Sequence, residues 1–238
     1  MNVENLLEIE NLRTEIEGAG APTRAVDGIS LDIGRGETFA LVGESGCGKS
    51  TVARLVVGLY PPTEGAIAFD GNDMSRKRSG AETAALRRRL QMIFQDPISS
   101  LNPRRRVKDI VAEPLDCWGT ATGDERDQIV VDLLNQVGID PTVYGNRYAR
   151  QFSGGQCQRI SIARSLAMRP KLMICDEMVS ALDVSVQAQI LNLLEDLKNE
   201  YGLTLLFIAH DLSVIQHISD RVIVMYLGKI MEISDSIN

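Results

Sequence analysis

Short apolar runs separated by polar breaks recur along the chain and indicate β-strands. Residues 7–12 alternate between apolar and polar side chains, which is the period of a half-buried strand. Residues 38–42 are continuously apolar, as in a strand of a buried parallel sheet. The same criteria, with turn signals at the ends of the runs, predict strands at residues 7–12, 28–33, 38–42, 66–69, 172–175, 204–209 and 222–226.

Helical periodicity occupies the stretches between these runs. Helices are expected directly after the 38–42 strand, at residues 158–168 and at residues 186–200. The first of them has an apolar face made of Val52, Leu55, Val56 and Leu59. From about residue 103 to residue 151 strand signals vanish and helical spacing takes over, as in Ile129, Leu133, Leu134 and Val137.

The order of the elements predicts the fold class. Strands that alternate with helices imply a mainly parallel sheet with right-handed crossovers, which is an α/β fold. A length of 238 residues suits one large domain of this class. We therefore predict a single domain, residues 1–238, with a core of residues 1–95 and 160–238 and a helical subdomain inserted at about residues 96–159.

Composition and charge narrow the functional class. The net charge of −7 argues against a general nucleic-acid binder, which would normally be basic. The longest apolar runs, residues 203–209 and 222–227, are too short to span a bilayer. Residues 1–4 lack the layout of a signal peptide. The chain is therefore expected to be cytosolic, with any membrane association supplied by a partner.

A glycine-rich loop lies between the 38–42 strand and the helix that follows it. It reads Gly43-Glu44-Ser45-Gly46-Cys47-Gly48-Lys49-Ser50-Thr51 and fits the P-loop pattern G-x-x-x-x-G-K-[ST]. Its glycines allow backbone N–H groups to surround phosphate oxygens, and the helix N-terminus favours the same anion. We expect Lys49 to reach the β- and γ-phosphates of a nucleotide and Ser50 to ligate Mg²⁺.

Two acidic residues follow the apolar run at residues 172–175. A buried strand that ends in carboxylates places them where ligands bind in open α/β sheets. Asp176 is suited to hold Mg²⁺ through water, and Glu177 is suited to polarise the water that attacks the γ-phosphate. In isolation this pattern would more often be a strand that enters a solvated turn, but the P-loop upstream favours the catalytic interpretation.

A third motif points to a family. Ser153-Gly154-Gly155-Gln156 opens a predicted helix and resembles the signature sequence of ABC ATPases, written L-S-G-G-Q, here with Phe152 in the first place. A helix start rich in serine and glycine is itself an anion site. Further motifs match in the family's order. The resemblance implies that Gln95 contacts Mg²⁺ and the membrane partner, that Asp183 lies in the D-loop, and that His210 touches the γ-phosphate.

The segments between the motifs narrow the resemblance. Residues 94–104, 112–115, 152–160 and 179–189 are similar to the ATPases of bacterial oligopeptide and dipeptide importers, most closely the second of their two ATPase subunits. Nickel and glutathione importers belong to the same family. The implied fold is a P-loop NTPase (RecA-like) core with an N-terminal antiparallel β subdomain and an inserted helical ABC subdomain.

The resemblance also implies partners and ligands. ATP and Mg²⁺ would bind between two ATPase domains in a head-to-tail pair, with the signature of one facing the P-loop of the other. The second ATPase subunit would complete a heterodimer, although a homodimer is possible. Transmembrane permease subunits would bind this pair at the cytoplasmic face of the inner membrane, where the chain would be a peripheral subunit. An extracytoplasmic solute-binding protein would be an indirect partner.

The sequence departs from the family in two places. Members usually carry an aromatic residue that stacks on adenine near position 16, where this chain has Ile16. The peptide-importer ATPases also carry a C-terminal extension, whereas this sequence ends at Asn238. Of the two basic runs, residues 87–89 and 104–106, surface charge is the plain interpretation. The more specific interpretation is that residues 104–106 face the membrane partner or acidic lipid.

Two other functions compete with that of a transporter ATPase. A soluble ABC ATPase that acts on DNA or ribosomes would usually have long coiled-coil insertions or two ATPase domains, and neither is visible here. A module that binds ATP without turnover would not need both Glu177 and His210. The cargo is a family-level inference, because the ATPase subunit does not touch it.

Overall fold

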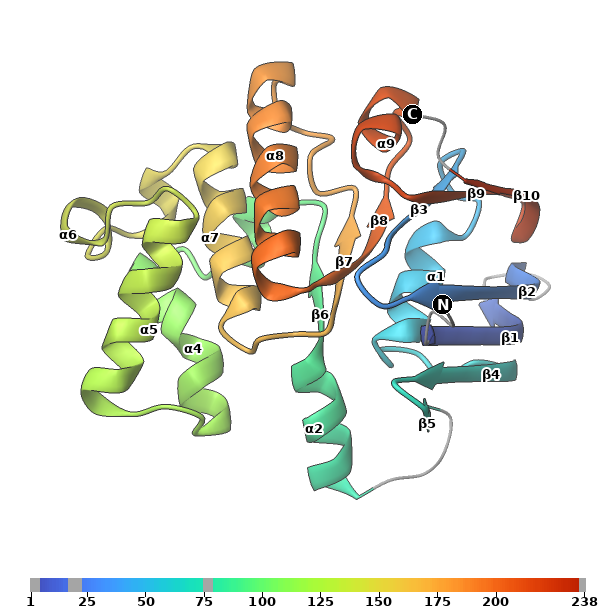
Figure 1. Ribbon diagram of the computed structural model, residues 1–238, viewed down its shortest axis with the longest axis horizontal. Coiled ribbons are helices and arrows are strands. Elements are labelled where there is room, and N and C mark those ends of the chain that lie inside the picture. The colour runs from blue at the N-terminus through green and yellow to red at the C-terminus, as the bar shows by residue number, and fades with distance from the viewer. Residues whose placement is uncertain (1–4, 17–22, 75–78, 236–238) are drawn as a thin grey trace.

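The computed structural model describes residues 5–16, 23–74 and 79–235. The prediction made on residues 1–4 concerns residues outside these ranges. The strands form two sheets (Figure 1). The antiparallel sheet has the order β2-β1-β4-β5, from β1 (Asn5–Ile16), β2 (Thr23–Gly34), β4 (Glu64–Phe69) and β5 (Asn72–Asp73). The second sheet has the order β10-β9-β3-β8-β7-β6, from β3 (Thr38–Gly43), β6 (Leu90–Ile93), β7 (Leu172–Asp176), β8 (Thr204–Ile208), β9 (Arg221–Tyr226) and β10 (Lys229–Asp235).

Strands β6, β7, β8, β3 and β9 run parallel to one another, and β10 pairs antiparallel with β9 at the edge. The carboxyl ends of the parallel strands therefore meet at one edge, where ligands bind in α/β sheets. The helices are α1 (Lys49–Val56), α2 (Gly80–Arg89), α3 (Pro97–Ser100), α4 (Val107–Trp118), α5 (Gly123–Gln136), α6 (Pro141–Tyr144), the 3₁₀ turn η1 (Ala149–Gln151), α7 (Gly154–Leu166), α8 (Val184–Tyr201) and α9 (Leu212–Ile218).

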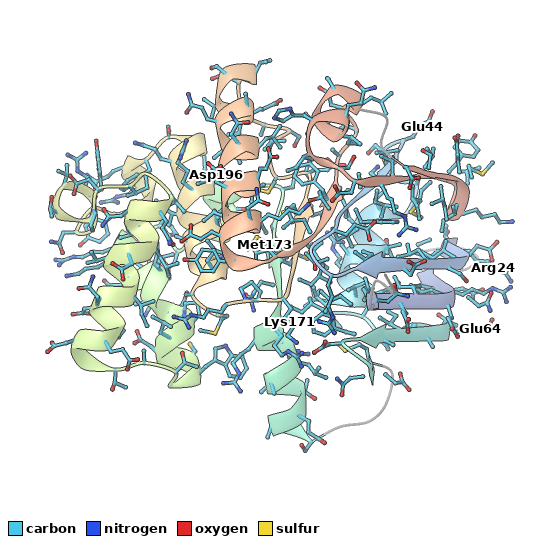
Figure 2. The ribbon with its side chains drawn as sticks, viewed as in Figure 1. Arg24, Glu44, Glu64, Lys171, Met173 and Asp196 are labelled. Atoms are coloured by element: carbon cyan, nitrogen blue, oxygen red, sulfur yellow. The ribbon has the colours of Figure 1, made fainter. Side chains whose placement is uncertain are left out.

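Two hydrophobic cores flank the parallel sheet. All five residues of β7 are buried, and the first four alternate between the cores. Leu172 and Ile174 pack in the core that α1 shares with the antiparallel sheet. Met173 and Cys175 face the core formed with α4, α5, α7, α8 and α9, as Figure 2 shows for Met173. Burial on both faces explains why β7 is apolar throughout until its terminal carboxylate.

The helices between β6 and β7 are collected at one end of the molecule. Helices α4, α5 and α6 lie on the far side of α7 from the sheets (Figure 1). This arrangement agrees with the predicted helical insertion, and the α/β fold with an antiparallel N-terminal sheet is confirmed. The boundaries at about residues 96 and 159 stay a prediction.

All seven predicted strands coincide with observed ones, but other details differ. Leu59 was wrongly placed on the buried face of the first helix: α1 ends at Val56, Gly58 has a φ of +71°, and Leu59 is exposed. Helix α7 begins at Gly154, four residues earlier than predicted, since two glycines lower the apparent helix propensity of its first turn. The elements α2, β5, β6 and β10 were not predicted.

Candidate functional site

The P-loop connects β3 to α1 at the carboxyl edge of the parallel sheet. Gly43, Gly46 and Gly48 have φ values of +150°, +81° and +110°, a region that glycine tolerates best. A Cβ atom at Gly43 would lie 2.2 Å from the carbonyl oxygen of Met225, and one at Gly48 would lie 2.3 Å from that of Ala25. Glycine is therefore required at both positions because the loop runs directly against the backbone of β9 and β2.

These contacts predict different costs for two glycine substitutions in the same loop. Gly43→Ala should lower the melting temperature more than Gly46→Ala, because nothing lies within 4 Å of a Cβ atom at Gly46. Positive φ alone costs about 1–3 kcal/mol for a residue other than glycine. At Gly43 the collision with Met225 adds to that cost. Thermal unfolding of the two variants tests this, and equal melting temperatures would show that the close packing is not important.

Lys49 is the first residue of α1, and its side chain is buried. Its Nζ donates to the carbonyl oxygens of Gly43 at 2.7 Å and Glu44 at 2.9 Å. The ammonium group is thus held over the loop, where the predicted phosphates would bind. Cys47 is buried in the same loop, with its Sγ 3.8 Å from Nζ.

Ser50 and Asp176 form the candidate magnesium site. Ser50 Oγ donates to Asp176 Oδ1 at 2.8 Å, although 126 residues separate them in the sequence. Asp176 is buried at the end of β7, and burial raises the pKa of its carboxyl group while the hydrogen bond from Ser50 opposes that shift. Hydroxyl and carboxylate oxygens suit Mg²⁺, which usually takes few protein ligands and completes its shell with phosphate and water. The donor set therefore fits the ion.

Glu177 lies at the centre of a second polar group. Gln95 Nε2 donates to Glu177 Oε2 at 2.9 Å, and His210 Nδ1 lies 4.0 Å from the same oxygen. These three residues follow β6, β7 and β8, which are adjacent in the sheet, so their side chains meet at its carboxyl edge. Glu177 has a φ of +48°, and Ser180 Oγ donates to its carbonyl oxygen at 2.8 Å. A strained backbone fixed in this way is typical of functional residues.

One cleft of about 540 Å³ is lined by members of both groups, although Asp176 and His210 are not among its lining residues. Lys49, Gln95 and Glu177 contribute to it, with Ser50 beside them. The cleft is lined by Thr23, Arg24, Ala25, Ser45, Gly46, Gly48, Lys49, Ser50, Thr51, Gln95, Glu177, Leu227 and Gly228. The wall formed by residues 23–25 and 227–228 was not predicted, because no motif marks it and only the packing of β2 and β9 brings it to the loop.

The signature residues do not line this cleft. Ser153 caps α7: its Oγ accepts from the backbone N–H of Gln156, and the Gln156 side chain accepts from the N–H of Ser153. A Cβ atom at Gly155 would lie 2.5 Å from Val186 Cγ1. The signature thus packs against the start of α8. Asp183 directly precedes this helix and is exposed. The structure does not bring Ser153–Gln156 or Asp183 to the P-loop of the same chain.

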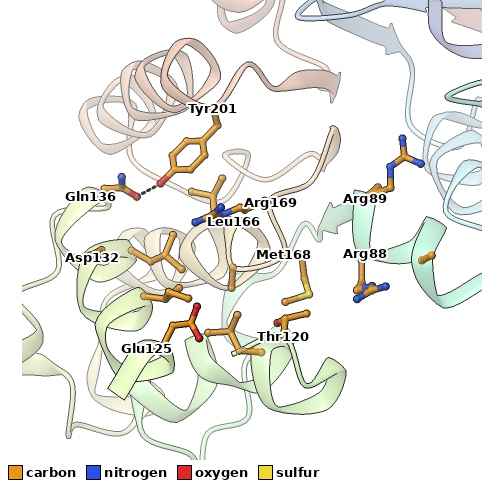
Figure 3. A pocket seen from close by; sticks show the side chains of 15 residues that line it. Arg88, Arg89, Thr120, Glu125, Asp132, Gln136, Leu166, Met168, Arg169 and Tyr201 are labelled. Carbon is orange, nitrogen blue, oxygen red and sulfur yellow. Dashed lines mark hydrogen bonds between the residues drawn. The ribbon is translucent and has the colours of Figure 1, made fainter. Parts of the chain in front are cut away.

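A larger cavity of about 580 Å³ lies elsewhere, between α2 and the helical region (Figure 3). Arg88, Glu125 and Tyr201 are among its lining residues, and Tyr201 donates to Gln136 across one side. None of the predicted phosphate-binding residues lines this cavity. The smaller cleft is therefore the candidate nucleotide site.

The remaining candidates from the sequence are the two basic runs, residues 87–89 and 104–106, which are surface features. Arg105 pairs with Glu113 at 2.5 Å, and Arg106 donates to Asn146 at 3.4 Å, so two residues of the 104–106 run are held within the chain. In the 87–89 run, Arg88 lies 5.7 Å from the ring centre of Trp118. None of the helices in the described ranges is both long and apolar enough to cross a membrane.

The fold and the cleft define a P-loop nucleotide-binding domain. The chain belongs to the ABC transporter family, whose sequence profile matches residues 26–180. It is 54% identical over 211 residues to the oligopeptide transport ATP-binding protein AppF of Bacillus subtilis, covering 89% of this chain and 64% of AppF. It is also 51% identical to OppF of the same organism, covering 97% of this chain and 76% of OppF.

Solved structures agree with this assignment. A dimeric post-hydrolysis state of the ATP-binding cassette MJ0796, bound to ADP and Pi, superposes with a TM-score of 0.86 at 28% identity. The match covers 98% of this chain and 99% of that one. The predicted family and fold class are thereby confirmed, and ATP is the ligand after which the related proteins are named. The roles of the individual site residues stay predictions.

Proposed function

We propose that this chain is the ATP-hydrolysing subunit of a transporter that imports oligopeptides. The observation that carries the proposal is the meeting of Lys49, the Ser50–Asp176 pair and the Gln95–Glu177 pair at one cleft. Phosphate-binding, metal-binding and water-activating groups are the parts that phosphoryl transfer to water requires. Peptide as cargo rests on relatives at 51–54% identity that are named for oligopeptide transport.

In this proposal the nucleotide lies along the cleft with its phosphates on the P-loop. When the nucleotide binds, the Lys49 ammonium group gives up its hydrogen bonds to two loop carbonyls and donates to the β- and γ-phosphates instead. Ser50, Asp176 (through water) and Gln95 would hold Mg²⁺, which would neutralise the charge that develops on the phosphate oxygens. The backbone N–H groups of residues 43–51 orient the same oxygens, because the loop glycines leave them unobstructed.

Glu177 accepts a proton from the attacking water, and its neighbours hold the carboxylate for that step. The hydrogen bond from Gln95 fixes one carboxylate oxygen, which leaves the other for water. His210, exposed at the end of β8, contacts the γ-phosphate. A cleft formed by one chain leaves the γ-phosphate accessible on the side where a second chain would present its signature.

The location of Ser153–Gln156 supports a paired arrangement. Within one chain these residues lie outside the cleft, so a complete site needs the signature and Asp183 of a second ATPase domain. The solved relative MJ0796 is dimeric with ADP and Pi bound. For this chain the second domain is proposed to be the companion ATPase subunit of a heterodimer, and a homodimer is the other candidate.

Membrane partners are proposed to contact the segment after β6. Phe94 and Ile98 are exposed apolar residues on either side of Gln95, and Gln95 bonds directly to Glu177. A permease subunit bound there would shift Gln95 and thereby the catalytic carboxylate. Arg104, exposed nearby in the sequence, is available for the same contact or for acidic lipid. The chain would then be peripheral at the cytoplasmic face of the membrane, with a solute-binding protein as an indirect partner.

The nucleotide dependence of pairing tests this arrangement. We expect the purified chain to be mainly monomeric at micromolar concentration without nucleotide, because association has an entropic cost that the protein surfaces alone do not offset. ATP that bridges two chains favours the pair by mass action. Analytical ultracentrifugation with and without MgATP, in the Glu177→Gln background to prevent turnover, measures this. A tight dimer without nucleotide would contradict it.

Phosphate release tests the catalytic proposal. The chain alone should hydrolyse ATP slowly, and addition of its companion subunit and permease should raise the rate. Release should require Mg²⁺ and fall to background when Mg²⁺ is chelated. ATP binding with no release under any of these conditions would favour a binding module without turnover.

A further inference from the structure

The nucleotide cleft extends past the P-loop on the side away from the catalytic carboxylate. In the sheet, β3 leads into the P-loop, β7 and β6 lead to Glu177 and Gln95 on one side, and β9 leads to Leu227 on the other. If the γ-phosphate faces Glu177, the α-phosphate and the nucleoside must extend toward β9 and the adjoining start of β2. That end of the cleft is lined by residues 23–25 and 227–228.

This far wall is fixed to the P-loop by backbone contacts. The N–H of Gly228 donates to the carbonyl oxygen of Cys47 at 2.9 Å, and the N–H of Asp27 donates to that of Gly228 at 2.9 Å. The close approach of Gly48 to Ala25 adds a third contact. The wall therefore has a defined position relative to bound phosphates, as a nucleoside-binding surface requires.

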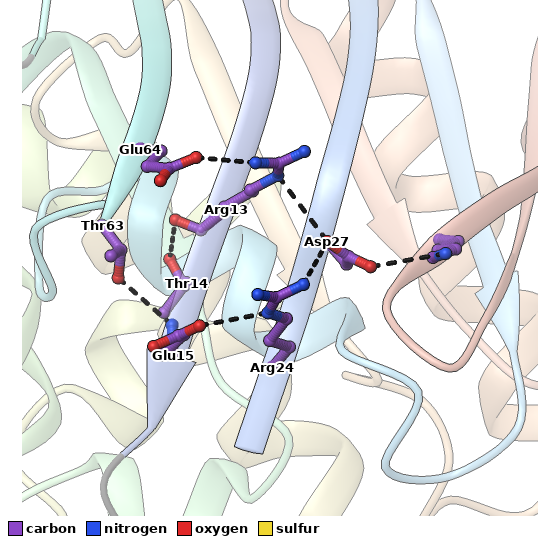
Figure 4. Close-up of polar contacts among 8 residues, drawn as sticks. Arg13, Thr14, Glu15, Arg24, Asp27, Thr63 and Glu64 are labelled. Carbon is purple, nitrogen blue, oxygen red and sulfur yellow. Dashed lines mark hydrogen bonds and ion pairs between the residues drawn. The ribbon is translucent and has the colours of Figure 1, made fainter. Parts of the chain in front are cut away.

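Arg24 is the charged side chain of this wall, and two carboxylates hold its guanidinium (Figure 4). Its Nε donates to Glu15 Oε1 at 3.1 Å, and its Nη1 lies 3.8 Å from Asp27 Oδ1. Asp27 is itself positioned by Arg13 at 3.6 Å and Lys229 at 3.4 Å. Arg24 is still 61% exposed, so ion pairs at the edge of the group leave its planar surface accessible.

The other described residues of the cleft offer no aromatic ring to a base. Leu227, which is 70% exposed, contributes apolar surface at the same end. Ile16 pairs with Thr23 through the backbone of β1 and β2, and Thr23 precedes Arg24 in the chain. A guanidinium is planar and weakly hydrated, and it stacks on flat π-systems where a lysine ammonium does not.

We propose that Arg24 positions the base of the nucleotide by stacking its guanidinium on the adenine ring, with Glu15 and Asp27 holding it in place. This inference rests on the proposed function, since it assumes that ATP binds in the cleft. It makes Arg24 a binding residue for the base, and Glu15 and Asp27 positioning residues that act through it.

Equilibrium binding of two ligands distinguishes base stacking from phosphate pairing. Arg24→Ala should weaken MgATP binding by about 3- to 10-fold, the range expected for a partly exposed cation–π contact. It should leave binding of inorganic tripolyphosphate, which has no base, unchanged. Arg24→Lys should behave like Arg24→Ala, because it keeps the charge without the plane. Arg126→Ala is the matched control, since Arg126 also pairs with two carboxylates, Asp116 and Asp127, but does not line the cleft.

Each outcome bears on a separate claim. Equal weakening of both ligands, with rescue by Arg24→Lys, would show that Arg24 pairs with phosphate and would overturn the proposal. Unchanged MgATP binding would overturn it as well. Glu15→Gln should weaken MgATP binding in the wild type but have no further effect beside Arg24→Ala, which a merely structural role would not produce. Failure of the proposed function is measured separately, as the absence of Mg²⁺-dependent phosphate release by wild-type protein that still binds MgATP. A wild type that does not bind MgATP would overturn both.

Discussion

Glu177→Gln should abolish ATP hydrolysis while leaving ATP binding intact. A positioned general base contributes about 10²- to 10⁴-fold to such a reaction, so phosphate release should fall by that factor. The amide has the shape of the carboxylate and can still accept the hydrogen bond that Gln95 donates at 2.9 Å. The substituted side chain also removes a negative charge close to the γ-phosphate. Binding should therefore be unchanged or somewhat tighter, and paired chains should accumulate with ATP trapped between them.

The matched control is Glu195→Gln, which changes an exposed glutamate on α8, away from the cleft. Single-turnover phosphate release and equilibrium ATP binding are to be measured for both variants. Turnover of Glu177→Gln within a few-fold of wild type would show that the base is another residue.

Lys49→Ala should have its largest effect on nucleotide affinity itself. The ammonium group is buried and would make charge-assisted hydrogen bonds to phosphate, worth about 1.5–3 kcal/mol. A loss of that size weakens binding roughly 10- to 150-fold. Tripolyphosphate should lose as much as MgATP, in contrast to the base-specific effect expected at Arg24.

Lys108→Ala, which removes an exposed lysine of α4, is the control for loss of positive charge. Lys49 also donates to two carbonyls of its own loop, so its removal could destabilise the fold. Thermal unfolding therefore distinguishes a loss of phosphate contacts from a loss of folded protein. Unchanged equilibrium binding of MgATP by a folded Lys49→Ala variant would contradict the P-loop assignment.

The sequence predicted those parts of the site that are encoded locally. The P-loop and the Asp176–Glu177 pair are contiguous, and each lies at the end of an apolar run that identifies its strand. The pairing of Ser50 with Asp176 follows from the parallel strands β3 and β7, which β8 separates, and from helix α1, which starts at the same edge of the sheet. Arg24 was not predicted, because it reaches the cleft through the packing of β2 against the loop, and the residues around it form no motif.

Two differences between the predicted and the observed elements have separate causes. Strand β6 has only four residues, too few to show a period, and follows a charged helix whose apolar spacing is weak. Helix α7 begins with two glycines that a propensity argument excludes, yet the capping box between Ser153 and Gln156 starts it there. Strand β6 is therefore determined by its pairing with β7, whereas the start of α7 is determined by a local cap that outweighs residue propensity.

Transport by the assembled complex tests the central claim most directly. The transporter co-purified through this chain is placed in vesicles with MgATP on the side of the ATPase subunits, and uptake of labelled oligopeptides from the other side is measured together with phosphate release. We predict that uptake requires MgATP and that Glu177→Gln in this chain reduces both uptake and phosphate release, although the complex still assembles and binds ATP. Peptide uptake at the wild-type rate in the Glu177→Gln complex would contradict the account, because this chain would then not be the subunit whose ATP hydrolysis drives import.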